Sequence, residues 1–507
     1  MRFVPIAFVT AFVPLTALVS ESVPQRATGL LIRGGELYDG TGVPARRADI
    51  RTEGDVIAAV APILEPRQGE RVIDAAGLSV APGFIDSHSH VAGGLQRDPG
   101  AGAHVRQGIT TAIVGQDGAS DLPVAETVED VERTPPAINV ATLVGHGTVR
   151  RVVMGADFRR AATSSEIEVM KTLVDRAMRD GAIGLSSGLE YDPGFYARPD
   201  ELAALARVAA AYGGYYASHV RDEEHEVFAA WQEAIEVGRL AGLPVVISHA
   251  KVAAKPVWGR SGDLVNVLEQ ARRNGVRVLA DWYPYTYWQS AIYVLIPDRD
   301  YENREKWRVG LDDVGGPDRV RVTDYGPDPS MNGRTLAQIA AARSADAVTT
   351  VIEMIRTAGP DIGIICESMI EPDLERLFAH PQVVVGSDGA LAGRHPRGYG
   401  SFPRVLGRYV RERGLVPLGE AIAKTSGRLA VHIGLADRGI VAPGKKADIV
   451  VFDQNVVADR GTPDQPSNPP VGIRYVVVNG VVVLDDGTAT AARPGRLLRR
   501  AVAAAAR

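Results

Sequence analysis

Two patterns of apolar and polar positions divide the chain. Residues 28–82 alternate short apolar runs with turn residues, as in Leu30–Ile32 followed by Gly34 and Gly35, which is typical of short β-strands. The pattern returns near the C-terminus, where Tyr475–Val483 has a hairpin's Asn-Gly turn at its centre. We therefore predict one small β-sandwich built from both chain ends, residues 23–82 and 434–490.

Between these segments, apolar strand-like runs alternate with helical segments, as in βα units around a parallel sheet. Eight runs carry the pattern: Phe84–His90, Thr110–Gly115, Ile138–Val144, Ile183–Ser187, Gly214–His219, Pro244–His249, Val276–Trp282 and Val383–Asp388. Eight repeats predict an α/β fold, a (β/α)8 barrel of the TIM type over residues 83–433. Barrels of this type carry their chemistry at the C-terminal ends of the strands.

One interval breaks this rhythm, between the seventh and the eighth run. Residues 296–359 are rich in Asp, Arg and Gly and then become helical at Leu336–Arg343 and Ala345–Ala358. We interpret this segment as an insertion, either a lid over the barrel mouth or a surface excursion without a function.

The two chain ends have their own character. Phe3–Ser20 contains no charged residue and predicts a secretory signal peptide over residues 1–22, hence a secreted or periplasmic protein. An uncleaved membrane anchor is the alternative, which Pro5 and Pro14 disfavour, and no later stretch is long and apolar enough to span a membrane. The basic, Ala-rich tail, residues 491–507, is expected to be a terminal helix or disordered.

Composition narrows the class of protein. The 507 residues include 56 Lys and Arg against 61 Asp and Glu, and a formal charge of −5 excludes a strongly basic nucleic-acid binder. The single cysteine, Cys366, cannot form an internal disulfide, and its apolar neighbours predict a buried packing role. The oligomeric state is left open.

Candidate metal ligands lie where several strand-like runs end. His88 and His90 share one face of a strand at positions i and i+2, although a bare His-x-His is more often a surface feature. Further runs end in His219, His249 and Asp388. If the barrel closes, these side chains converge into a pocket of nitrogen and oxygen ligands for one or two divalent metals.

Together these motifs resemble those of the amidohydrolase superfamily, and within it the D-aminoacylase (N-acyl-D-amino-acid deacylase) family. The resemblance extends from about residue 28 to 487 and is carried by the stretches 82–90, 144–150, 218–223, 247–251, 283–285, 386–389 and 395–404. It implies a barrel that carries one or two Zn²⁺ ions, a small β-sandwich and a lid. It also implies hydrolysis of the amide bond of N-acyl-D-amino acids, and the preference for D substrates comes from the resemblance alone.

The resemblance also implies roles for the candidate ligands. His219 and His249 would hold the tighter zinc, and His88 and His90 a second metal. Asp388 would be the general base and acid, which takes a proton from the metal-activated water and passes it to the departing amine.

One motif departs from the family pattern. D-aminoacylases carry a cysteine ligand in Gly-Asn-Cys-Gly, whereas this chain has Gly115-Gln116-Asp117-Gly118. The bridging ligand is therefore either Asp117 or Glu190, which follows the fourth run. We favour Glu190, because the preceding turn Ser186–Gly188 could expose it to the pocket; either carboxylate suits a harder metal than a thiolate does.

A substrate with a free carboxylate needs fixed cations. The resemblance assigns Lys251 and Arg397 to this carboxylate, with Tyr285 and Ser290 as hydrogen-bond partners, although Arg397 could instead form a surface salt bridge. His146 is expected either to polarise the scissile carbonyl or to pack behind the site.

Two further functions remain possible from the sequence. A related metal-dependent dipeptidase or cyclic-amide hydrolase would use the same metal ligands, but a cyclic amide lacks the free carboxylate and would make Lys251 and Arg397 dispensable. A binding protein that has lost catalysis is the non-enzyme alternative, which the intact metal-ligand set disfavours. The aromatic cluster around Tyr283 could line a pocket for an apolar side chain or acyl group.

Overall fold

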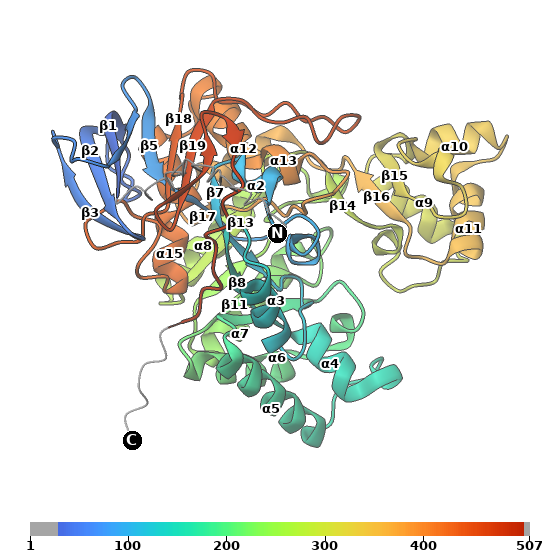
Figure 1. Cartoon of the computed structure of the whole chain (residues 1–507). Coiled ribbons are helices and arrows are strands. Elements are labelled where there is room, and N and C mark those ends of the chain that lie inside the picture. Colours follow the sequence, from blue (N-terminus) through green and yellow to red (C-terminus); the bar gives the residue numbers. More distant parts are fainter. Residues whose placement is uncertain (1–28, 501–507) are drawn as a thin grey trace, which may run out of the picture.

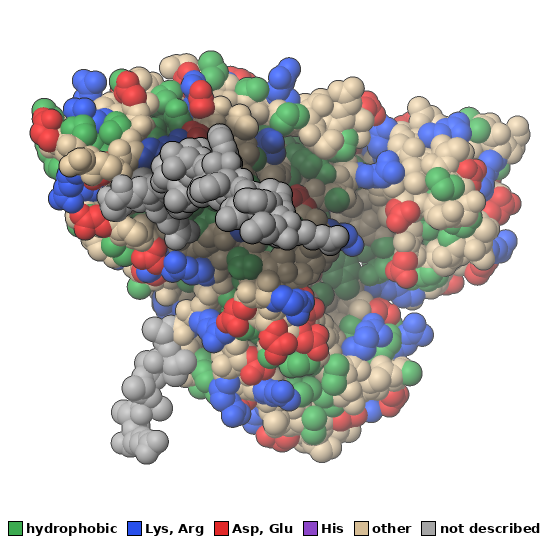
Figure 2. Space-filling view, in the orientation of Figure 1, with side chains coloured by type: hydrophobic (Ala, Val, Ile, Leu, Met, Phe, Trp, Pro, Cys, Tyr) green, Lys and Arg blue, Asp and Glu red, His purple; other side chains and the backbone are tan. Residues whose placement is uncertain are grey.

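A computed structural model describes residues 29–500. The predicted signal peptide, residues 1–22, lies outside the described residues. Within residues 29–500, every helix is too short or too polar to cross a membrane. On the face shown in Figure 2, basic and acidic side chains are interspersed, in agreement with the balanced composition.

All eight predicted runs become strands, and they lie side by side as a barrel. The strands are β6 (Phe84–Asp86), β7 (Ile109–Val114), β8 (Asn139–Thr142) continued by β9 (Val144–Gly145), β10 (Gly184–Gly188), β11 (Tyr215–His219), β12 (Val245–Ile247), β13 (Val278–Trp282) and β17 (Val383–Val385). They form two parallel sheets, β6-β7-β8 and β9-β10-β11-β12-β13-β17. The third strand is interrupted at Leu143, and a parallel bridge between Ser89 and Gly389 joins the first strand to the last. Apolar side chains such as Ile85, Val246 and Val384 fill the interior.

Helices cover the outside of the barrel (Figure 1). The main ones are α4 (His146–Met154), α5 (Ser164–Asp180), α6 (Pro199–Ala211), α7 (Val227–Ala241), α8 (Ser261–Arg273), α12 (Glu371–Ala379), α14 (Leu418–Thr425) and α15 (Gly427–Ile433). Helix α5 shows why such segments are helical: Thr163 and Glu166 form a capping box, and its apolar positions, including Met170 and Val174, are buried.

Strands from both chain ends join, as predicted, but in one continuous sheet. The nine strands are β1 (Gly29–Leu37), β2 (Arg46–Glu53), β3 (Val56–Ala61), β4 (Arg71–Asp74), β5 (Ser79–Pro82), β18 (Ile449–Phe452), β19 (Ile473–Val478), β20 (Val481–Asp485) and β21 (Thr488–Ala489). The two halves meet where β5 pairs with β18, with Ala81 opposite Val450. The predicted hairpin is present, and its Asn479 and Gly480 have φ of 48° and 78°.

The insertion is wider than predicted. It contains β14 (Trp288–Ala291), α9 (Arg304–Asp313), β15 (Val320–Asp324), α10 (Leu336–Ala342), α11 (Ala347–Ala358) and β16 (Gly363–Cys366). The antiparallel sheet β14-β16-β15 brings residues 288–366 into one unit, which projects from the barrel in Figure 1. Cys366 lies in β16 and is fully buried, as predicted.

The prediction of a helical or disordered tail is wrong for its described part. Leu497 pairs in parallel with Val140, and the backbone N–H of Leu498 donates to the carbonyl of Val140 at 2.7 Å. The two leucines give this basic segment an apolar anchor, and Leu498 packs with the residues of the barrel interior. An extended strap satisfies the backbone of β8 in a way that a helix could not.

Candidate metal centre

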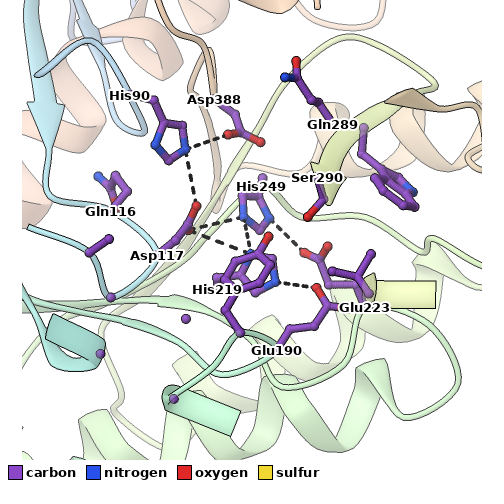
Figure 3. Close-up of a pocket in the computed structure, with 18 of the residues that line it drawn as sticks. His90, Gln116, Asp117, Glu190, His219, Glu223, His249, Gln289, Ser290 and Asp388 are labelled. Atoms are coloured by element: carbon purple, nitrogen blue, oxygen red, sulfur yellow. Dashed lines mark hydrogen bonds and ion pairs between the residues drawn. The ribbon is translucent and has the colours of Figure 1, made fainter. Parts of the chain in front are cut away.

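A pocket of about 610 Å³ opens at the C-terminal ends of the barrel strands. Its lining includes six of the residues singled out as metal ligands or proton carrier: His90, Asp117, Glu190, His219, His249 and Asp388. Another predicted ligand, His88, is fully buried and lies outside this lining. The barrel therefore brings together the side chains that the strand-end pattern predicted to converge (Figure 3).

Asp117 is the residue around which the histidines gather. Its Oδ1 lies 3.4 Å from Nε2 of His88, 3.5 Å from Nε2 of His249 and 3.9 Å from Nδ1 of His219. Its Oδ2 lies 3.3 Å from Nε2 of His90. One carboxylate therefore faces all four imidazoles, as a ligand shared by two neighbouring metal positions would.

Glu190, the favoured bridging residue, does not occupy this position. Its Oε2 lies 2.8 Å from Nε2 of His219, on the side of that ring away from Asp117. Among the three histidines labelled in Figure 3, Glu190 contacts only His219. The geometry thus favours Asp117 as the shared ligand and corrects our preference, while Glu190 can orient His219 from behind.

The local backbone explains how Asp117 reaches the centre. Gly115, Asp117 and Gly118 all have positive φ, at 76°, 55° and 74°. A Cβ at Gly115 would lie 2.3 Å from the carbonyl oxygen of Leu143, so only glycine allows this close approach. The two glycines, rather than the carboxylate itself, were the signal in the sequence that marked this turn as specialised.

Three of the eight non-glycine residues with positive φ in the described chain belong to this centre. They are Asp117, His249 (φ 36°) and Asp388 (φ 51°). Such conformations are costly for side-chain-bearing residues and persist where the surroundings enforce them, which is common at functional sites. At His249 the enforcing contact is a 2.7 Å hydrogen bond from its backbone N–H to Oδ1 of Asp281.

The donor set fits a divalent cation. His88, His90, Asp117 and Asp388 can each turn one ligand atom to a common point, and so can Asp117, His219 and His249. Both ring nitrogens of His88 and Oδ1 of Asp117 are buried without a hydrogen-bond partner in residues 29–500. Buried polar atoms are rarely left in this state, and imidazole and carboxylate ligands are those that Zn²⁺ takes.

The charges within the cluster support the same conclusion. Burial by itself would lower the pKa of His88, but the carboxylates of Asp117 and Asp281 raise it well above its usual value. For His90, Asp117 and Asp388 outweigh burial and raise the pKa to about 9. This concentration of negative charge around the two imidazoles is the field in which a bound cation would be stabilised.

Asp388 lies between a candidate metal ligand, His90, and the predicted carboxylate-binding cation, Arg397. Its Oδ1 lies 3.1 Å from Nε2 of His90, and its Oδ2 lies 2.6 Å from Nη1 of Arg397. Burial would raise the pKa of Asp388, but Arg397 and the neighbouring histidines hold it well below its usual range. Asp388 is therefore an ionised carboxylate, able to accept a proton.

Lys251 is paired with a residue that sequence reasoning missed. Its Nζ donates to both carboxylate oxygens of Glu223, at 2.7 and 2.8 Å, and both side chains are buried. Glu223 also lies 2.8 Å from Nδ1 of His249, so it connects the cation to a metal ligand. Glu223 closes the Ser218–Glu223 motif, and its place beside His219 was the available signal.

Tyr283, rather than Tyr285, lies with the two cations. The guanidinium of Arg397 is 4.9 Å and Nζ of Lys251 is 5.8 Å from the centre of the Tyr283 ring. The Tyr283 hydroxyl is buried and has no hydrogen-bond partner in the described chain. The Tyr285 hydroxyl instead donates to Asp459 at 3.3 Å, outside the pocket lining, so its predicted role is not supported.

The position of His146 agrees with only one of the two roles expected for it. It begins α4, and its Nε2 lies 2.8 Å from Oε1 of Glu201 on α6, among buried residues outside the pocket lining. The structure thus agrees with the packing alternative and not with a contact to the scissile carbonyl. Ser290 does line the pocket, on the wall that β14 supplies.

Two further buried carboxylates position the centre from behind. Asp281 lies 3.7 Å from Nδ1 of His88 and also holds the backbone of His249. Asp86 accepts from the backbone N–H of Ser387 at 2.7 Å and from its hydroxyl at 2.5 Å, which ties the first strand to the loop that carries Asp388. Neither residue stood out in the sequence, because their contacts are between distant segments.

Comparisons with known proteins agree with this geometry. The family model described as "Amidohydrolase family" matches residues 71–349 and 318–484. The D-aminoacylase of Alcaligenes xylosoxydans xylosoxydans is 38% identical over 499 residues, which cover 94% of this chain and 98% of the relative. The N-acyl-D-glutamate deacylase of the same organism is 39% identical over 500 residues, with coverages of 94% and 97%.

Solved structures show the same likeness. The crystal structure of an N-acyl-D-glutamate deacylase from Bordetella bronchiseptica, complexed with zinc and a phosphonate inhibitor that mimics the tetrahedral intermediate, superposes with a TM-score of 0.83. It is 38% identical in sequence, and the match covers 93% of this chain and 99% of that one. Sequence, fold and donor set thus agree, and the chain belongs to the amidohydrolase family.

Proposed function

We propose that this protein is a zinc-dependent hydrolase that cleaves the amide bond of N-acyl-D-amino acids. The observation that carries the proposal is the approach of one carboxylate, Asp117, to all four histidines, with Asp388 and a pair of cations on the same pocket. The similarity to named D-aminoacylase and N-acyl-D-glutamate deacylase supports the class of substrate.

Zinc would be held by His219 and His249 at one position and by His88 and His90 at the other, with Asp117 shared between them. When bound, zinc supplies a Lewis acid that acidifies water and polarises a carbonyl. The number of zinc ions needed for activity depends on how strongly Asp117 binds zinc at each of the two positions.

Asp388 then moves the proton that the reaction requires. Its ionised Oδ1, beside His90, accepts a proton from the attacking water as the new C–O bond forms at the acyl carbon. It returns this proton to the amine nitrogen as the C–N bond breaks. The products are a carboxylic acid and the free D-amino acid, so atoms and charges balance.

The free α-carboxylate of the substrate is assigned to Arg397 and Lys251. Both cations line the pocket, and the hydroxyl of Ser290 adds a neutral donor. Because Arg397 is paired with Asp388 and Lys251 with Glu223, a substrate carboxylate would share cations that already have partners. This favours linear substrates over cyclic amides, which have no carboxylate to place there.

The test compares hydrolysis of N-acetyl-D-methionine, its L enantiomer and its D methyl ester by the zinc-loaded enzyme. We expect rapid release of methionine from the D acid, and a kcat/KM about 100-fold lower or more for both controls, as expected when a polar contact is lost or misplaced. Equal rates for acid and ester would favour a cyclic-amide or general amidase activity. Binding of the acid without any turnover would favour a binding protein.

We also propose that residues 1–22 are a signal peptide and that the mature protein is secreted or periplasmic. The uncharged run Phe3–Ser20 supports this. Mass spectrometry of the protein purified from the extracytoplasmic fraction should show an N-terminus near residue 23. A full-length protein in the membrane fraction would instead indicate an uncleaved anchor.

A further inference from the structure

One carboxylate lines the active-site pocket without any partner. Glu224 lies in the loop between β11 and α7, one residue after the Glu223 that holds Lys251. Its backbone N–H donates to Oδ1 of Asp222 at 2.7 Å, which fixes the loop. Across residues 29–500, its carboxylate takes part in no hydrogen bond or ion pair, although it lines the pocket.

The surroundings of Glu224 are strongly acidic. Burial and then the charges of Glu190, Asp222, Asp313 and Glu223 raise the pKa of its carboxyl well above the usual value. Glu190, Glu223 and Asp313 have basic partners, His219, Lys251 and His225, whereas the carboxyl of Glu224 has none in the described chain. A cation placed beside Glu224 would therefore be favoured over an anion. The local negative charge therefore disfavours an acidic ligand group more than a neutral one.

The neighbouring pocket wall suits the stem of a long side chain. Trp288 and Val294 of the insertion line the same pocket. Glu224 lines this pocket together with these two apolar residues. A pocket with an apolar wall and a carboxylate suits a lysine-like side chain. The methylene groups of such a chain can pack on the wall while its ammonium group meets the carboxylate.

The other pocket cation in the described chain is already engaged. Arg151 donates to the carbonyl of Asp192 at 3.3 Å and packs over the ring of Phe158. Lys251 and Arg397 are assigned to the α-carboxylate, while Glu190 and Asp192 of the same lining have basic partners, His219 and Arg299. Glu224 is therefore the charged group of the described lining that is free to bind the substrate side chain.

We infer that Glu224 selects N-acyl-D-amino acids whose side chain ends in a cation, such as N-acyl-D-lysine or N-acyl-D-ornithine, and disfavours acidic side chains. This inference rests on the proposed function and extends it to the substrate class. The chain is similar to a protein named N-acyl-D-glutamate deacylase, whose name indicates a substrate with an acidic side chain. For the present protein we predict the opposite preference, for a basic side chain.

The test measures kcat/KM for N-acetyl-D-lysine, N-acetyl-D-norleucine and N-acetyl-D-glutamate. Norleucine carries a similar hydrocarbon stem without the ammonium group, so the lysine-to-norleucine ratio isolates the charge. In Glu224→Gln this ratio should fall about 10- to 100-fold, the value of a charged hydrogen bond. In the control Glu226→Gln, an exposed glutamate two residues further on, the ratio should stay as in the wild type.

Glu224→Lys should reverse the order and favour N-acetyl-D-glutamate. A wild type that prefers the glutamate substrate, or a ratio that is the same in Glu224→Gln and wild type, would overturn the inference while leaving the proposed function intact. Failure of the wild type to hydrolyse any of the three D substrates would overturn both.

Discussion

Nη1 of Arg397 lies 2.6 Å from Oδ2 of Asp388, so the cation assigned to the substrate carboxylate also holds the proton carrier. Both side chains are buried, which strengthens their interaction. In the proposed mechanism, this ion pair would couple substrate binding to proton transfer. The coupling explains how a buried carboxylate stays ionised although its desolvation opposes ionisation.

Replacing Asp388 with Asn should remove the proton carrier and keep the shape of the site. We expect kcat/KM for N-acetyl-D-methionine to fall about 10²- to 10⁴-fold, the usual value of general acid–base catalysis. Elemental analysis should show that zinc bound through the histidines and Asp117 is largely retained. Wild-type activity in Asp388→Asn would show that another group carries the proton.

Arg397→Met should shift the pH profile. Arg397 holds the pKa of Asp388 low, so its loss should raise that pKa and move the acidic limb of kcat/KM towards higher pH. KM should rise as well, because the α-carboxylate loses a cation. Arg397→Lys keeps the positive charge, so its acidic limb should lie close to that of the wild type while its KM stays raised. If the acidic limb of Arg397→Met lies at the same pH as that of the wild type, the ion pair does not control the pKa of Asp388.

Asp117 and Glu190 should differ in metal binding. Asp117→Ala removes the carboxylate that faces all four histidines, and zinc content should fall at both positions. Glu190→Gln loses only a partner of His219, and we expect zinc affinity to weaken about 10- to 100-fold there, as for other outer carboxylates. Competition with a chromogenic chelator measures both. Two zinc ions in Asp117→Ala and one or none in Glu190→Gln would restore Glu190 as the bridge.

Lys424 should give the stability a pH dependence of its own. It is fully buried, and burial lowers its pKa from 10.5 to about 7. Between these values the unfolded chain binds the extra proton, so the contribution to stability rises with pH and is lost as the pH falls through about 7. The free energy of unfolding of the wild type relative to Lys424→Met should therefore increase between pH 7 and about pH 9. A constant difference would mean that Lys424 is charged throughout, held by the carbonyls of His380 and Val383.

The barrel could be predicted from sequence because its signals are local. Each strand is a short apolar run, and the polar residues follow at the same end, so the convergence of His219 and Asp388 on one pocket could be predicted from the sequence. The conformation that lifts Asp117 towards the centre is a left-handed turn packed against Leu143. Gly115 and Gly118 indicate a specialised turn, but not the direction in which it carries the carboxylate, so the sequence alone did not favour Asp117 over Glu190.

Contacts between distant segments account for the other differences. Residues 288–366 form one unit only because β14 and β16 pair, and no local sequence pattern predicts that pairing. The ring direction of His146 depends on Glu201, a helix away in sequence. Asp281 and Glu223 act through hydrogen bonds that exist only once the barrel has closed.

The central claim is that the cluster around Asp117 binds zinc and that this zinc is required to hydrolyse N-acyl-D-amino acids. The most direct measurement is the rate of N-acetyl-D-methionine hydrolysis by chelator-stripped enzyme during titration with zinc. Almost no activity is expected in the stripped enzyme, with recovery as the first equivalents of zinc bind and no recovery in Asp117→Ala at the same zinc concentrations. Full activity in enzyme shown by elemental analysis to be free of metal would rule out a requirement for zinc.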